Sequence, residues 1–282
     1  MLSYRHAFHV GNHADVLKHV VLVQLLRRLT RKDKPLLFAD THAGAGMYSL
    51  EHGYAARNAE FASGIGRLWS HSALPDLVAD YVAAVRVVNP DGVLRHYPGS
   101  PQIAAQVLRP QDRLQLFELH STDSEILATH FREGGRRVVV NAGDGYSGLK
   151  AVLPPPSRRG LVLLDPSYEL GDDYRAVGSA LTEALRRFAT GTYVIWYPQL
   201  ARREAVQLPA RLLRLAAAGD WLHVALRVKT PSPDGFGLHG SGLFVLNPPW
   251  KVASELEAVM PFLTDVLGQD SGAHFQLEYR ES

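Results

Sequence analysis

The sequence predicts an α/β protein in which a mostly parallel sheet of seven strands, with an antiparallel last strand, is covered by helices on both faces. Five short apolar runs alternate with helical patterns along the 282 residues, and two later apolar runs are joined by a glycine-rich loop. Strands that are apolar on both faces and separated by helices are typical of parallel sheets. The loop between the last two runs is too short for a crossover helix, so these strands should pair antiparallel.

The first element is a predicted helix over residues 14–30, which Asn12 can cap. Asp15 stands three residues after Asn12, in a position that resembles a capping box. Polar residues at helical spacing predict a basic face opposite an apolar face that meets the core. These polar residues are Gln24, Arg27, Arg28 and Arg31.

Seven strands follow the helix. The first strand, residues 36–40, runs directly into the turn "THAGAG". About residues 47–110 look mostly helical, and we interpret them as an insertion subdomain within a single domain that spans residues 1–282. The remaining parallel strands are expected at 114–119, 137–141, 161–165 and 192–197, and the antiparallel pair at 222–229 and 242–247.

The composition excludes several kinds of site. The sequence contains no cysteine, which rules out disulfides, thiolate metal sites and cysteine nucleophiles. The longest apolar stretch, residues 20–26, is too short to span a bilayer, and residues 1–13 lack the apolar core of a signal peptide. We therefore expect a soluble, cytoplasmic protein. The net charge of +2 does not by itself indicate nucleic-acid binding.

Ligand-binding residues are predicted where successive strands end. Gly44 and Gly46 allow the backbone to approach a ligand closely after the first strand, and Glu118 ends the second strand, where it can bind two ribose hydroxyls. A nicotinamide dinucleotide fits poorly, because Ser49 stands where a third glycine belongs. S-adenosylmethionine (SAM) fits better, because it has no pyrophosphate, and Asp144 beyond the third strand can contact its adenine. Each residue alone could equally be a turn or strand-end residue.

Two stretches compete as the reactive site, "DPSY" at 165–168 and "NPPW" at 247–250. Methylating an amino group on a base requires two acceptors for the amine hydrogens and an aromatic ring that stacks on the base. Asp165, the carbonyl of Pro166 and the ring of Tyr168 can supply them. Ligands bind beyond the carboxyl ends of parallel strands, where Asp165 lies. Asn247 ends an antiparallel strand, so we interpret "NPPW" as a strand stop with a packed tryptophan.

Several motifs together resemble one known family. They are "MLSYRHAFHVGNHADVLKH", "DTHAGAG", "YPGSP", "ELH", "SRRG" before "DPSY", and "NPPW". This combination resembles the RlmJ family of bacterial 23S ribosomal RNA adenine-N6 methyltransferases, essentially from end to end. The resemblance implies a class I SAM-dependent methyltransferase fold, which is Rossmann-like, with a helical insertion after the first strand. The family has a second proline where this chain has Ser167, so we expect a less rigid loop with both acceptors retained.

The resemblance also implies roles for individual residues. Asp165 would be the catalytic residue, and residues 1–13 would form a flap over the site. Cofactor contacts are implied for His19, His42, Ser100, Glu118, Asp144 and Gly145. Tyr4, His6 and Lys18 are implied to lie near the substrate adenosine. By their spacing His6, His9 and His13 could instead bind a metal, but Gly11 breaks the helix that would align them and we expect no metal.

We therefore expect a SAM-dependent enzyme that methylates N6 of a specific adenosine in 23S ribosomal RNA. The RNA would be naked or an early assembly intermediate, and the enzyme a monomer. The basic helix face and the loop 230–241 are candidates for holding the RNA. The alternatives are a non-catalytic RNA-binding protein with a decayed site, and a DNA adenine-N6 or protein-glutamine methyltransferase with the same chemistry.

Overall fold

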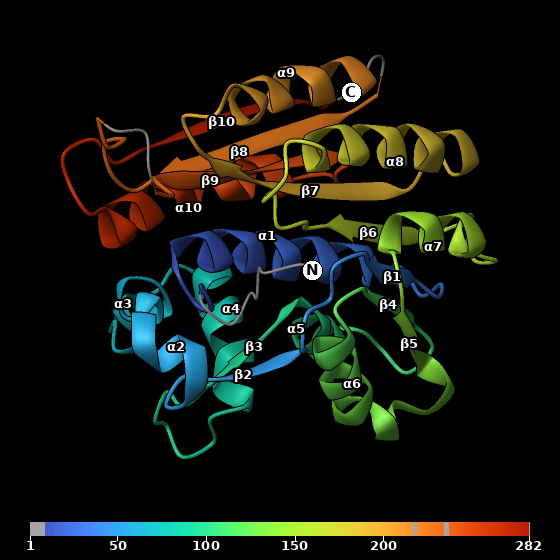
Figure 1. The fold of residues 1–282 in the computed structure, drawn as a ribbon, viewed down its shortest axis with the longest axis horizontal. Helices are drawn as coiled ribbons and strands as arrows, with labels where there is room; N and C mark the ends of the chain where they lie inside the picture. Colours follow the sequence, from blue (N-terminus) through green and yellow to red (C-terminus); the bar gives the residue numbers. More distant parts are fainter. Residues whose placement is uncertain (1–8, 217–218, 234–236, 282) are drawn as a thin grey trace.

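The computed structural model describes residues 9–216, 219–233 and 237–281, and its main sheet is drawn in Figure 1. The strands of this sheet run in the order β10-β8-β9-β7-β6-β1-β4-β5. They are β1 (Leu37–Asp40), β4 (Arg113–Glu118), β5 (Val138–Ala142), β6 (Gly160–Leu164), β7 (Thr192–Gln199), β8 (Trp221–Arg227), β9 (Gly240–Leu246) and β10 (His274–Arg280).

The strand directions agree with the prediction. Strands β5, β4, β1, β6 and β7 are parallel to one another, and β9 pairs antiparallel with both β7 and β8. All seven predicted strands form within two residues of their expected ends. The predicted total was wrong, because β10 adds an eighth strand antiparallel to β8. Most side chains of β10 are exposed or half-buried, so this edge strand lacks the apolar run that marks the others.

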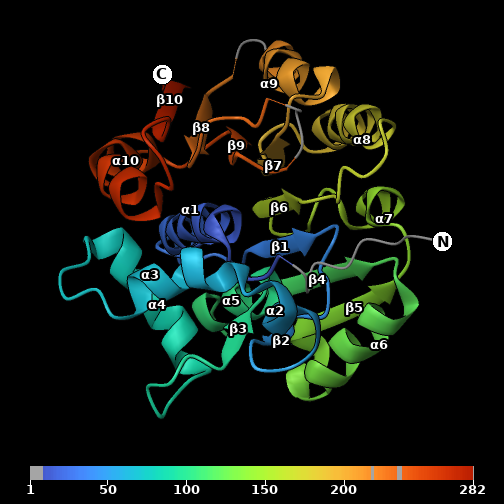
Figure 2. The same cartoon turned by 60° about the vertical axis from the view of Figure 1, so that its left-hand side comes forward.

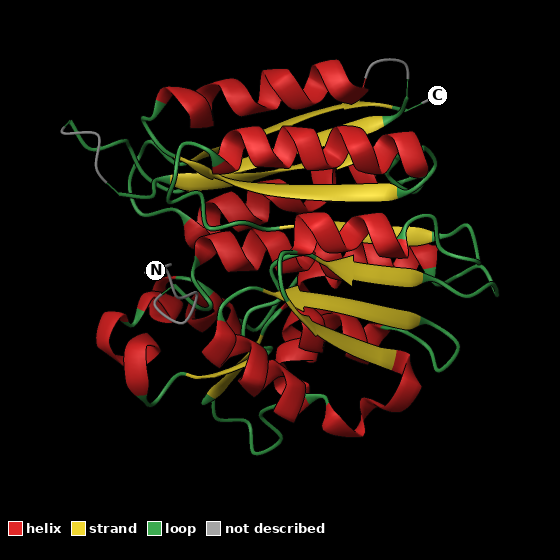
Figure 3. Cartoon of the chain, turned by 45° about the vertical axis from the view of Figure 1, so that its right-hand side comes forward, coloured by secondary structure: helices red, strands yellow, loops and turns green. Residues whose placement is uncertain are grey.

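Helices cover both faces of the sheet (Figure 2). One core lies between the sheet and α1 (His13–Leu29), α4 (Asp76–Val87), α5 (Ser100–Val107), α6 (Ser121–His130) and α10 (Val252–Leu267). The other core lies beneath α7 (Gly145–Val152), α8 (Asp173–Arg187) and α9 (Arg203–Ala216). Figure 3 shows these helical layers on either side of the strands.

Helix α1 begins as predicted but is more deeply buried. The Asn12 side chain accepts hydrogen bonds from the backbone N–H groups of Ala14 and Asp15, at 2.9 and 3.1 Å. Every residue from His13 to Leu26 is buried, because α1 packs against α4, α5, α10 and β9 at once. The predicted division into a basic and an apolar face is therefore wrong for most of the helix.

The basic residues at the end of α1 are largely paired. Arg28 forms a salt bridge with Glu255 of α10, and Gln24 donates a hydrogen bond to the same carboxylate. Arg27 lies within salt-bridge distance of Asp80 of α4. These pairs join α1 to its neighbours, so this region is not the open basic surface that the sequence indicated.

The chain between β1 and β4 contains both helices and a small sheet. It consists of β2 (Met47–Ser49), α2 (Gly53–Asn58), the 3-10 helix η2 (Glu60–Ser63), α3 (Ile65–Trp69), α4, β3 (His96–Pro98) and α5. Strands β2 and β3 pair antiparallel, and α5 packs on α1, β1 and β4. A second 3-10 helix, η3 (Arg132–Arg137), precedes β5. Among the described residues, no helix is long and apolar enough to cross a membrane.

Candidate active site

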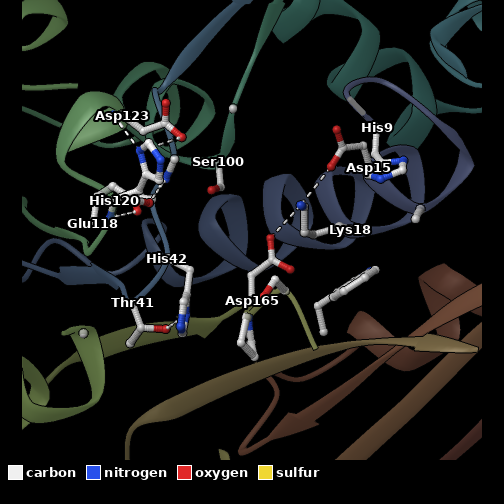
Figure 4. Close-up of a pocket in the computed structure, with 18 of the residues that line it drawn as sticks. His9, Asp15, Lys18, Thr41, His42, Ser100, Glu118, His120, Asp123 and Asp165 are labelled. Carbon is white, nitrogen blue, oxygen red and sulfur yellow. Dashed lines mark hydrogen bonds and ion pairs between the residues drawn. The ribbon is translucent and has the colours of Figure 1, made fainter. Parts of the chain in front are cut away.

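A cavity of about 460 Å³ lies at the carboxyl ends of the parallel strands, where an open α/β sheet is expected to bind its ligand. Its walls come from the first half of α1, from the loops after β1, β4, β5 and β6, and from β7. Figure 4 shows Lys18 and Asp165 pointing toward each other on one side, with Glu118 and His120 on another. The cavity is lined by the predicted residues Lys18, His19, His42, Gly44, Ser100, Glu118, Asp144, Gly145, Asp165 and Pro166.

The loop after β1 is held close to the end of β4. The backbone N–H of Gly44 donates to Glu118 Oε2 at 2.8 Å, and Glu118 Oε1 accepts from the N–H of His120 at 2.7 Å. Gly44 has a φ of +60°, and a Cβ atom there would lie 2.2 Å from the hydroxyl oxygen of Tyr48. Both the positive φ and this close approach favour glycine at the position. Burial raises the pKa of Glu118, and the two backbone hydrogen bonds offset part of that effect.

Gly46 serves the turn and does not line the cavity. Its φ is +78°, and its carbonyl accepts a hydrogen bond from the N–H of Gly99 at 2.9 Å. That bond places the start of α5, and with it Ser100, against the loop after β1. The structure thus shows a structural role for Gly46, and its expected contact with a ligand stays a prediction.

Asp144 and Gly145 form the start of α7 at the end of β5. The Asp144 side chain caps the helix by accepting from the N–H groups of Tyr146 and Ser147, at 3.2 and 3.1 Å. Burial alone would raise the pKa of Asp144, but the hydrogen bonds from Ser147 and Tyr146 lower it overall. A Cβ atom on Gly145 would lie 2.2 Å from the carbonyl oxygen of Thr41, so glycine lets α7 approach the loop after β1.

Asp40, at the end of β1, is a central residue that sequence reasoning missed. It is fully buried, accepts a hydrogen bond from Ser100 Oγ at 2.6 Å, and accepts another from the N–H of His42 at 3.1 Å. Burial raises the pKa of Asp40 to about 7, and the nearby Asp165 carboxylate adds to the shift. Burial also lowers the pKa of His42 to about 4, so this ring is neutral at pH 7. The sequence signal that could have identified Asp40 is its place as the one charged residue at the end of the apolar run "LLFAD".

Lys18 forms salt bridges with two carboxylates, Asp15 and Asp165. Its Nζ atom lies 2.7 Å from Asp165 Oδ2 and 2.8 Å from Asp15 Oδ1, and its side chain is buried. Burial alone would lower the pKa of Lys18, but Asp15 and Asp165 outweigh it and raise that pKa. Asp15 also accepts a hydrogen bond from the N–H of Gly11 at 2.8 Å. The cation therefore stays charged and fixes the Asp165 carboxylate in the cavity wall.

The "DPSY" loop reaches the cavity with three of its four residues. Asp165, Pro166 and Ser167 line it, but Tyr168 does not. With a φ of +54°, Tyr168 turns into the core beside α8, where it is 2% exposed. Its hydroxyl donates to the carbonyl of Trp196 at 2.7 Å. The expectation that Tyr168 presents its ring to a base is therefore corrected, and Trp196 is the neighbouring aromatic side chain that lines the cavity.

The "NPPW" stretch lies at the opposite edge of the sheet. The Asn247 side chain donates to the carbonyls of Ala189 and Gly191, at 2.8 and 2.7 Å, just before β7 begins. Asn247 thus ends β9 by anchoring another loop, as expected for a strand stop. The expected packing of Trp250 is wrong, because this side chain is 68% exposed, with Lys251 Nζ 4.3 Å from its ring centroid.

Some predicted residues cannot be placed. Tyr4, His6 and most of the expected flap lie outside the described residues. His9 bonds to Glu60 through Nδ1 at 3.0 Å, and His13 is buried in the first turn of α1. Within the described ranges, no group of three or more His, Cys, Asp or Glu side chains could hold a metal ion.

Comparison with known proteins connects this geometry to a family. A family model described as "Ribosomal RNA large subunit methyltransferase D, RlmJ" matches residues 33–280. The Escherichia coli K12 protein named ribosomal RNA large subunit methyltransferase J is 48% identical over 265 residues, covering 93% of each chain. The Haemophilus influenzae protein of the same name is 43% identical over 280 residues, covering 99% of each chain. A crystal structure of a Legionella pneumophila protein superposes with a TM-score of 0.87 at 37% identity, covering 96% of this chain and 98% of that one.

Proposed function

Because this chain belongs to the RlmJ family and is a methyltransferase with the α/β class I fold, we propose that it transfers a methyl group from SAM to N6 of an adenosine in 23S ribosomal RNA. One observation carries the proposal. Asp165 and Pro166 lie at the carboxyl end of β6, in the wall of the cavity. Glu118 at the end of β4 and Asp144 after β5 line the same cavity. The names of the relatives support ribosomal RNA of the large subunit as the substrate.

The residues that line the cavity suit SAM, which carries a sulfonium and an ammonium group. Among the described residues, the lining contains several carboxylates but only one lysine or arginine, Lys18. The carboxylates are Asp15, Glu118, Asp123, Asp144, Asp165 and Asp173. An acid-rich, partly desolvated cavity favours a cationic ligand. Glu118 would hold the ribose, Asp144 and Gly145 would lie at the adenine, and His19, His42 and Ser100 would bind the rest of the cofactor.

The reaction needs positioning more than acid–base chemistry. SAM supplies an electrophilic methyl group when it is bound. The Asp165 carboxylate and the Pro166 carbonyl would accept hydrogen bonds from the two N6–H groups, which localises the nitrogen lone pair and aims it at the methyl group. Lys18 holds Asp165 in place through their salt bridge. Asp165 is also the acceptor placed for the proton that the methylated amine must then lose.

The target base must leave its stack to reach this site. Several groups of the reactive wall are deeply buried, with Lys18 3% exposed and His19 fully covered. Only an unpaired or flipped nucleotide can insert that far. We therefore propose naked 23S RNA or an early assembly intermediate as the substrate. We also propose that the enzyme acts as a monomer, since described residues of a single chain line the cavity.

The loop between β8 and β9 is the better candidate for an RNA contact. It follows a strand that runs parallel to β7, so it lies at the same edge as the cavity, and Leu238 from this loop lines the cavity. The basic end of α1 lies elsewhere, since Arg28 is ten residues beyond Lys18, about 15 Å along the helix axis. RNA binding at this loop requires contact with phosphates, which its Lys229 can make.

The test is nucleoside mass spectrometry of 23S ribosomal RNA from cells with and without this protein. We expect one N6-methyladenosine site to disappear without the protein and to return with the wild-type chain but not with Asp165→Ala. An unchanged set of methylated adenosines would refute the proposed substrate. The non-catalytic alternative predicts full restoration by Asp165→Ala, and a DNA methyltransferase would instead change genomic N6-methyladenine.

A further inference from the structure

A buried row of three side chains connects the segment between β1 and β4 with the wall of the cavity. His19 Nδ1 lies 2.7 Å from the Tyr97 hydroxyl oxygen, and that oxygen lies 3.0 Å from the hydroxyl oxygen of Tyr81. All three side chains have an exposed fraction of 0%. His19 comes from α1, Tyr97 from β3 and Tyr81 from α4. The row therefore begins in the inserted segment and ends at a residue that lines the cavity.

The protons of this row can be assigned by counting donors and acceptors. Burial raises the pKa of both Tyr81 and Tyr97, so both hydroxyls keep their protons. Among the described residues, Tyr97 is the sole hydrogen-bond partner of the Tyr81 hydroxyl. The Tyr81 hydroxyl proton can therefore form a hydrogen bond only if Tyr81 donates it to the Tyr97 oxygen.

That direction decides the next step. If Tyr81 donates to Tyr97, the Tyr97 proton is directed to His19 Nδ1, which must then be the unprotonated, accepting nitrogen. In the reverse direction Nδ1–H would donate to Tyr97, Tyr97 would donate to Tyr81, and the Tyr81 proton would be buried without an acceptor. Leaving a buried hydroxyl proton without an acceptor is costly, and this favours the first direction.

We propose that Tyr97 is a positioning residue that fixes His19 as the Nε2–H tautomer, so that His19 donates a hydrogen bond to the carboxylate of SAM. This inference rests on the proposed function for the identity of the ligand. It gives the segment between β1 and β4 a direct part in cofactor binding. The carboxylate of the ligand needs such a donor, because most charged groups in the lining are themselves carboxylates.

The tautomer can be read directly in the full-length, ligand-free protein. In a ¹H–¹⁵N long-range correlation spectrum, a protonated and an unprotonated imidazole nitrogen have widely separated ¹⁵N shifts. The His19→Gln variant identifies the signals of His19 among the 13 histidines. We expect Nε2 to be protonated and Nδ1 to be unprotonated. An Nδ1–H tautomer or a cationic ring in the wild type would overturn the proposal.

Single-hydroxyl variants separate a tautomer effect from a loss of stability. Tyr97→Phe removes the donor to Nδ1, so we expect a mixture of tautomers and a Kd for SAM raised roughly threefold to tenfold, with little change in kcat. Tyr81→Phe leaves Tyr97 able to donate only to His19, so the Nε2–H tautomer should remain. If Tyr97→Phe kept the pure Nε2–H tautomer and the wild-type Kd, the assigned role would be wrong.

Tyr193→Phe is the matched control. Its hydroxyl is also buried, and it donates to the carbonyls of Ala184 and Phe188 in the other core. We expect this variant to lose stability without changing the His19 signals or the Kd for SAM. Binding by calorimetry also separates the two proposals. If the wild type bound no SAM, the proposed function would fail, whereas the ligand-free spectrum would still decide the tautomer.

Discussion

At the scale of single residues, the candidate site is a set of charges whose partners make their burial possible. Lys18 is 3% exposed and Asp15 is 2% exposed, yet each lies within hydrogen-bond distance of the other, and Lys18 also contacts Asp165. A buried charge without a partner would cost several kcal/mol. The Asp165 carboxylate, which we propose to be catalytic, is therefore held by a network that begins in the first turns of α1.

Asp40 should make stability depend on pH. Its pKa is raised to about 7 in the folded protein, so between about pH 4 and 7 the native state binds more protons than the unfolded chain. The contribution of Asp40 to stability is therefore full below its unfolded pKa and is lost as the pH rises toward 7. Denaturant unfolding at several pH values should show this decline in the wild type and not in Asp40→Asn. Parallel pH profiles for the two proteins would contradict the assignment.

Asn247 tests the choice between the two tetrapeptides. Asn247→Ala removes two hydrogen bonds and places alanine at a φ of +51°, so we expect a loss of roughly 1–3 kcal/mol in the free energy of unfolding. Because Asn247 is remote from the cavity, kcat should stay within about twofold of wild type. Loss of methyl transfer in a well-folded variant would show that the sheet edge is wrongly assigned.

At the scale of elements, strands with continuous apolar runs were predictable and the arrangement around α1 was not. Apolar runs such as 161–165 favour buried strands, so these strands and their approximate ends can be predicted from the sequence. The polar residues of α1 suggested a solvent-exposed face, because the carboxylates that pair with them lie far away in the sequence. Glu255 is more than 200 positions from Arg28, and no local pattern indicates that contact.

The pairing of Arg28 leads to a prediction about that helix. Arg28→Ala should lower the free energy of unfolding by roughly 1–3 kcal/mol, because a largely buried charged hydrogen bond to Glu255 is lost. Affinity for a 23S RNA fragment and its dependence on salt should stay unchanged. Lys229→Ala, in the loop beside the cavity, is the comparison and should weaken binding and reduce the salt slope. If Arg28→Ala also reduced the salt dependence of RNA affinity, the basic residues of α1 would contact RNA after all.

The site residues were predictable where strand order alone places them. Asp165, Glu118 and Asp144 follow successive parallel strands, and these must meet at one edge. The direction of the Tyr168 ring was not predictable, because one backbone angle turns it into the core. Tyr97 and Tyr81 were also missed, since only the folded chain brings them to His19.

At the scale of the whole molecule, the cavity joins parts of the chain that are far apart in sequence, from α1 to the loop before β9. A ligand that binds there should therefore stabilise the entire fold. At a SAM concentration one hundred times Kd, the expected gain is about 2.7 kcal/mol, visible as a higher Tm. Glu118→Ala should reduce this shift, whereas Glu183→Ala, on the exposed side of α8, should not. An identical shift in both variants would argue against the assigned ribose site.

The central claim is that Asp165 directs methyl transfer to adenine N6 in ribosomal RNA. The most direct measurement uses labelled SAM, protein-free 23S RNA and nucleoside analysis of the product. We expect N6-methyladenosine with the wild type, a rate at least about 100-fold lower with Asp165→Ala, and a smaller loss with Asp165→Asn, which keeps one acceptor oxygen. Undiminished N6-methyladenosine formation by folded Asp165→Ala would contradict the account.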